Sequence, residues 1–120
     1  MNLEEFYHSI GGNYQNVLIY LPSTTLIMKY IKKFLDDNSF NLLEKNLKEK
    51  NYKEAFLACH TLKGICSNLG FGSLLKSSSI LVEELRDCNN INIINVSNYF
   101  ELVKDNYILL VNKINELINN

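Results

Sequence analysis

The apolar residues of this chain recur at intervals of three and four positions, and this spacing predicts helices. The clearest case is residues 52–69, a stripe followed by Gly70, where a glycine commonly ends a helix. Its apolar members are Tyr52, Ala55, Phe56, Cys59, Leu62, Cys66 and Leu69. The same spacing predicts short helical segments over 3–10 and 14–21, and helices over about 23–35, 40–50, 73–88 and 96–118.

The predicted fold is all-α. The chain has only five glycines and one proline in 120 residues, so it has few places to turn. Short connections between long amphipathic helices favour antiparallel neighbours. We therefore expect an antiparallel up-down four-helix bundle over residues 23–118. Residues 1–22 form an extra short helical segment that covers it, and the length argues for a single domain over 1–120.

Charge and composition narrow the function classes. Twelve Lys and Arg stand against 13 Asp and Glu, a net charge of −1. This balance argues against nucleic-acid binding and against a basic helix on a membrane surface. No apolar run approaches the ~18–20 residues of a membrane span, and the acidic N-terminus does not resemble a secretory signal. Three cysteines without a CxxC pair indicate reduced thiols, so we expect a cytoplasmic protein. For the oligomeric state, which the sequence leaves open, the default expectation is a monomer.

The candidate chemistry lies in residues 60–70, whose sequence is HTLKGICSNLG. Helical residues three, four and seven positions apart share one face. His60, Lys63, Gly64 and Ser67 therefore lie together on a face that borders the core. A lone helical histidine is more often an ordinary surface or core residue, so His60 gains meaning only from these neighbours.

Gly64 is the anomaly on this face. A glycine inside a helix costs roughly 0.5–1 kcal/mol relative to alanine. Two explanations are open. Gly64 either allows tight packing against another helix, or it leaves clearance for a partner to approach the His60 ring.

Lys63 adds a chemical reason for the pattern. An uncharged imidazole is a nucleophile, and much imidazole is uncharged at neutral pH because its unperturbed pKa is near ~6.5. A phosphoryl group on the ring is dianionic, and a lysine one turn away can neutralise it. The pattern therefore suits reversible phosphoryl storage. Ser67 either adds a hydrogen bond or is an ordinary exposed serine.

At these residues the chain resembles a known family. The run HTLKG at 60–64, followed six residues later by Gly70, is similar to the signature of histidine phosphotransfer (HPt) domains. These are the phosphocarriers of bacterial and plant–fungal phosphorelays. The similarity continues through residues 52–55 before the motif and 69–74 after it, and it covers roughly 24–118.

The resemblance implies a role for each matching position. His60 is the phosphoacceptor, and Lys63 positions or neutralises the phosphoryl group. Gly64 leaves room for the acidic pocket of a response-regulator receiver domain, and Gly70 ends the helix. The implied partners are such a receiver domain and a hybrid sensor histidine kinase.

The chain departs from the family at one position. Many members carry Gln or Glu on the following helix, reaching back to the histidine ring, whereas this chain has Val82 there and Glu83 one place on. What orients the imidazole is therefore open, and Ser78 or Ser79 are weak substitutes. Arg86, one turn further along, either borders the partner surface or is an ordinary solvated arginine.

Other chemistries lack their motifs. The sequence has no phosphate-binding loop for ATP and no zinc-ligand spacing, so we expect no cofactor, no metal and no enzyme activity of its own. The cysteines fit core positions better than ligand positions. The main alternative to a phosphocarrier is a helical docking module that binds a receiver or another signalling partner without being phosphorylated.

Overall fold

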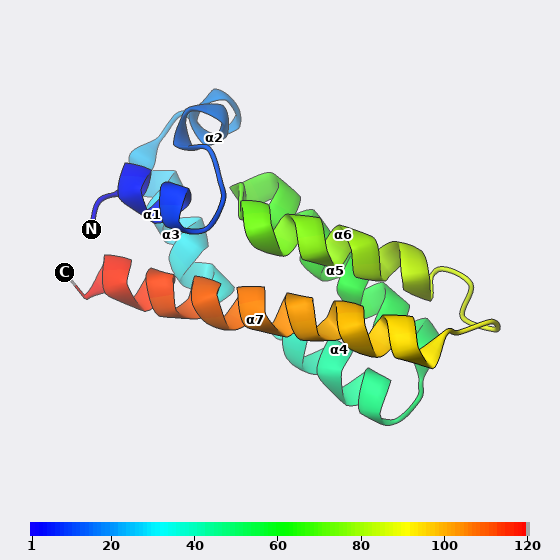
Figure 1. Ribbon diagram of the computed structural model, residues 1–120. Helices are drawn as coiled ribbons and strands as arrows, with labels where there is room; N and C mark the ends of the chain where they lie inside the picture. The colour runs from blue at the N-terminus through cyan, green and yellow to red at the C-terminus, as the bar shows by residue number, and fades with distance from the viewer. Residues whose placement is uncertain (120) are drawn as a thin grey trace.

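The computed structural model describes residues 1–119, and within these residues the chain is helical and contains no strand. The predicted all-helical class is therefore confirmed for this part of the chain. The helices are α1 (Leu3–Ser9), α2 (Tyr14–Tyr20), α3 (Thr24–Phe34), α4 (Ser39–Lys48), α5 (Tyr52–Leu69), α6 (Gly72–Leu85) and α7 (Ile93–Ile118) (Figure 1). None of the described helices is both long and apolar enough to cross a membrane.

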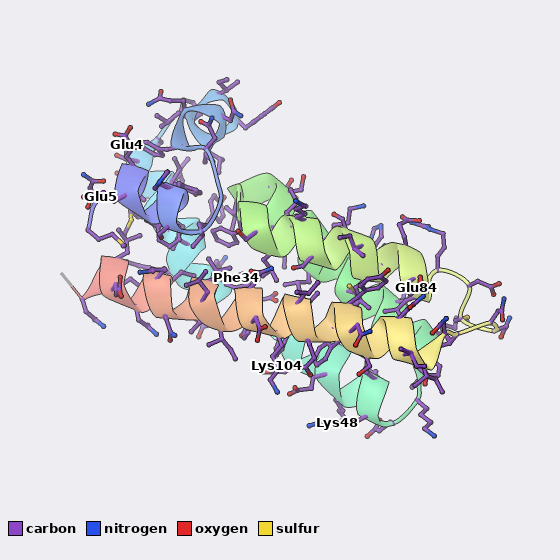
Figure 2. All side chains as sticks on the ribbon, viewed as in Figure 1. Glu4, Glu5, Phe34, Lys48, Glu84 and Lys104 are labelled. Carbon is purple, nitrogen blue, oxygen red and sulfur yellow. The ribbon has the colours of Figure 1, made fainter. Side chains whose placement is uncertain are left out.

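Helices α4 to α7 pack on one another in chain order, α4 on α5, α5 on α6 and α6 on α7. Aromatic rings join α7 back to α4, because Phe40 stacks on Phe100 and Tyr107 with centroid distances of 5.7 and 4.0 Å. Lys104 of α7, labelled in Figure 2, lies on the side of α7 that faces α4. It pairs with Glu44 of α4 at 3.5 Å. Buried residues of all four helices fill the space between them, and they include Leu43, Leu62, Leu81 and Val103.

The segment before α3 packs on the turn between α5 and α6. The Tyr7 hydroxyl of α1 donates a hydrogen bond to the Leu69 carbonyl at 2.8 Å. The backbone N–H of Ser73 donates to the Ile10 carbonyl at 3.0 Å. The backbones approach so closely that a Cβ on Gly72 would collide with the carbonyl oxygen of Gly11. Residues 1–22 thus hold one end of the α5–α6 pair.

Helix α3 buries a narrower stripe than its sequence predicts. Ile27, Ile31 and Phe34 are buried, and the Phe34 ring packs 5.2 Å from Phe71 and 6.0 Å from Tyr107 (Figure 2). Leu26 and Tyr30, which the spacing assigns to the same stripe, are 41% and 37% exposed. The difference arises because α3 packs on α5 and α7 along one side only.

Helix α5 begins and ends where the sequence predicts. Gly70 follows it in the left-handed conformation, with φ 73°, as expected of a glycine that ends a helix. Helix α6 ends three residues earlier than predicted, because the Asp87 carbonyl accepts from the Asn90 N–H and starts a turn. Helix α7 begins three residues earlier, because the Asn92 side chain accepts from the Asn95 N–H at 3.0 Å and caps the helix there.

The start of α7 is also joined to the end of α6. The Asn95 side chain donates to the Glu84 carboxylate at 2.8 Å. Figure 2 shows Glu84 where the two helices approach each other. This contact fixes the end of α6 that lies nearest to the candidate site described below.

Candidate functional site

The residues singled out in α5 lie where the helical spacing places them. His60, Gly64 and Ser67 are exposed, Lys63 is half-buried at the edge of the same face, and Leu62 points into the core. Among residues 1–119, none makes a hydrogen bond to the His60 imidazole. The ring is therefore reachable by a partner.

Gly64 faces open space. A Cβ added at this position would meet no atom within 4 Å apart from its own helix and chain neighbours. Its φ is not in the left-handed region, since Gly11 and Gly70 are the described glycines with positive φ. Packing against another helix within residues 1–119 therefore does not account for the glycine, and clearance for a partner stays a prediction.

Phe56 belongs to the site, although its spacing assigns it to the core stripe. The structure places it half-buried at the rim of α5, one turn before His60. Its ring centroid is 6.0 Å from that of the imidazole, at an interplanar angle of 44°. The separation of four residues places Phe56 and His60 on neighbouring turns of one helix face, but it does not distinguish a rim position from a core position.

Arg86 reaches the same place from α6. Its guanidinium lies over the Phe56 ring, 5.4 Å from the centroid. Glu83 accepts two hydrogen bonds from it, at 3.1 Å from Nε and 2.8 Å from Nη2. Arg86 and its partner Glu83, which the sequence placed only beside Val82, therefore lie beside the candidate site.

The charges of this cluster interact. The hydrogen bond from Arg86 is the largest influence on Glu83 and lowers its pKa; desolvation opposes it, and the charges of Arg86 and then Lys63 lower the pKa by smaller amounts. The carboxylate therefore senses a cation from each of the two helices. We name Phe56, Glu83 and Arg86 the α6 flank of the site.

The serines proposed as substitutes for the missing polar residue do not orient the imidazole. Val82 is fully buried. The Ser78 and Ser79 hydroxyls both donate to the Leu75 carbonyl within α6, at 3.2 and 2.6 Å. The aromatic ring of Phe56 packs beside the imidazole.

A groove lies on the opposite flank of α5. It has a volume of ≈ 480 Å³ and is lined by Tyr20, Leu21, Tyr30, Ile65, Asn68 and Leu69. Ile65 and Asn68 are one and four residues after Gly64, so the groove opens beside the exposed face. Tyr20 is 81% exposed and forms its rim.

Cys59 and Cys66 are buried in the core as predicted, whereas Cys88 is only half-buried, in the loop after α6. Burial raises the pKa of the Cys59 thiol to about 12 and that of Cys66 as well, so both are protonated, unreactive core residues. In the part of the chain that the structure describes, no group of three His, Cys, Asp or Glu residues is placed to hold a metal ion.

Comparisons of the chain with protein-family models, with curated proteins and with solved structures gave no match. The interpretation of the site therefore rests on the motif in α5 and on the geometry around it.

Proposed function

We propose that this chain is a histidine phosphotransfer protein that carries a phosphoryl group reversibly on His60. The observation that carries the proposal is the open surface at Gly64, one turn from an exposed imidazole that makes no hydrogen bond to any residue of 1–119. A glycine that weakens its helix, and whose position leaves room for a side chain among the described residues, fits an external partner that must approach closely. We further propose that α4 to α7 form the antiparallel up-down four-helix bundle of that family.

The proposed reaction is a direct exchange between two phosphoryl linkages. The imidazole nitrogen without a proton attacks the phosphorus of a receiver aspartyl phosphate, and the N–P bond forms as the acyl P–O bond breaks. The electron pair leaves with the aspartate carboxylate, while the other ring nitrogen keeps its proton. The reverse step passes the group to a second receiver. The receiver supplies the Mg²⁺ that neutralises the transferring group.

The other residues of the face assist this exchange. Lys63 supplies a positive charge one turn from His60, and Ser67 lies on the docking surface a turn beyond Gly64. A partner seated over Gly64 meets the α6 flank on one side and the groove at Ile65 on the other. The sequence has no phosphate-binding loop for ATP, so the proposed source of the phosphoryl group is a hybrid sensor histidine kinase. We propose that the exchange takes place in the cytoplasm.

A second candidate function is docking to a partner without phosphoryl transfer. It is favoured by Val82, because no polar side chain from α6 holds the imidazole in one tautomer. In that case the chain is a docking module for a receiver or another signalling partner.

Phosphoryl transfer from a receiver charged with acetyl phosphate separates the two. The wild-type chain gains the label and His60→Gln does not, while circular dichroism shows equal helicity in both. Binding of the receiver without labelling of either chain would favour the docking module. Labelling of the variant would place the phosphoryl group on another residue.

A further inference from the structure

Three contacts link an anionic side chain to the imidazole face. Glu83 holds the Arg86 guanidinium by two hydrogen bonds, the guanidinium lies over Phe56, and Phe56 contacts the His60 ring. Arg86 and His60 thus share one aromatic neighbour although they come from different helices. Both partners of the ion pair are solvent-exposed, at 56% for Arg86 and 62% for Glu83.

We propose that Glu83 is the resting counter-ion of Arg86, and that Arg86 exchanges it for the phosphoryl group when His60 becomes phosphorylated. This proposal rests on the function proposed above. In it, the exchange sets how strongly His60 retains the phosphoryl group. It assigns a regulatory role to Glu83, which never contacts the reacting atoms.

The geometry favours such an exchange. An exposed ion pair is weakly held, so Arg86 can leave Glu83 without a large loss. The planar guanidinium binds carboxylate and phosphoryl oxygens with the same two-pronged geometry, and the phosphoryl group offers more charge and a third oxygen. The Phe56 ring contacts both the guanidinium and the imidazole, so it keeps the resting guanidinium on the side of α5 that carries His60.

Glu83 also opposes phosphorylation. Without the phosphoryl group, Glu83, Arg86 and Lys63 together carry one net positive charge. The dianionic group reverses that sign, and Arg86 must give up its hydrogen bonds to Glu83 before it can bind the group. Glu83 therefore shifts the transfer equilibrium toward the phosphorylated receiver, whereas Arg86 shifts it toward phosphorylated His60.

The test is the equilibrium ratio of phosphorylated to free chain after mixing with a phosphorylated receiver, measured by intact mass. We expect Glu83→Gln to raise this ratio about threefold and Arg86→Gln to lower it by a similar factor. In the double variant the Glu83→Gln effect should disappear, because Glu83 acts through Arg86. Glu101→Gln, which removes an exposed carboxylate from α7, is the matched charge control and should leave the ratio unchanged.

Opposite shifts that are lost in the double variant support the exchange. Glu83→Gln shifting the ratio equally with and without Arg86 would overturn it in favour of long-range charge. Two single variants that move the ratio in the same direction would overturn it in favour of a structural role. If the wild-type chain takes no phosphoryl group, the proposed function fails and this inference falls with it, whereas failure of the variants alone removes only the inference.

Discussion

At the scale of single residues, Gly64 is the position where helix stability and the proposed docking favour different side chains. Every other glycine that the structure describes would place a Cβ against a neighbouring atom, whereas Gly64 would not. Its helical backbone gives no reason for glycine. The residue thus weakens its own helix, and clearance for a partner is the explanation that we propose.

Gly64→Ala should therefore stabilise the protein. Alanine has the higher helix propensity and meets no atom here, so the free energy of unfolding should rise by about 0.5–1 kcal/mol. Urea unfolding followed by circular dichroism measures the change. A fall in stability would show that Gly64 packs against something and would remove the argument for clearance.

Gly64→Leu should keep the fold and weaken docking. The larger side chain projects from the exposed face beside His60, where the partner is proposed to sit. Receiver binding by calorimetry should fall at least tenfold, while the unfolding midpoint is not lowered. Unchanged affinity would place the partner elsewhere on the surface.

At the scale of helices, α5 and α6 are held in register by their turn and by the segment packed on it. Gly70 adopts a left-handed conformation that favours glycine. Gly72 meets the backbone of Gly11, which cannot move aside as a flexible side chain can. This register brings Arg86 over Phe56, so the turn positions the α6 flank.

Gly72→Ala should have the opposite effect to Gly64→Ala. The added methyl collides with the Gly11 carbonyl and forces the N-terminal segment away, at a cost of about 1–3 kcal/mol. The same urea experiment compares two identical chemical changes at two helical glycines. Equal effects of the two substitutions would contradict the packing described for this turn.

The sequence predicted the helices well because their signals are local. Gly70 and the stripe of α5 marked that helix. Serine is a common helix cap, and the Ser23 hydroxyl caps α3 by accepting from the Leu26 N–H at 3.2 Å. The exposure of Leu26 and Tyr30 was not predictable, since it depends on which neighbours α3 meets.

For the same reason, the sequence predicted the part of the candidate site that lies on α5 but not its contacts with residues from α6. His60, Lys63, Gly64 and Ser67 share a face by helical spacing alone. The contact of Arg86 with Phe56 joins residues 30 positions apart and depends on the register of α5 against α6. No pattern within one helix contains that information.

At the scale of the whole molecule, several ionisable groups are buried as neutral core residues. Burial raises the pKa of Cys59 to about 12 from a usual value of 9.0, and it raises the pKa values of Cys66 and Tyr7 too. The folded chain therefore keeps protons that the unfolded chain loses in alkaline solution. Stability gained from these groups is complete below pH 9 and is lost as the pH rises above it.

Alkaline pH should accordingly destabilise the protein. Between pH 9 and 12 the free energy of unfolding should fall by about 1.4 kcal/mol per pH unit for each buried thiol. Urea unfolding at pH 8 and 10.5 under reducing conditions measures the slope. Cys88→Ser should retain it, because Cys88 is outside the core, whereas Cys59→Ala should reduce it. A stability independent of pH in this range would contradict the burial of these groups.

The most direct test of the central proposal is phosphorus NMR of the chain after mixing with a phosphorylated receiver. We predict a phosphohistidine signal that is stable in alkali, is lost in acid and is absent from His60→Gln. Absence of that signal from the wild-type chain, with several receivers tried, would contradict a phosphocarrier. The face around Gly64 would then belong to a protein that docks without carrying the group.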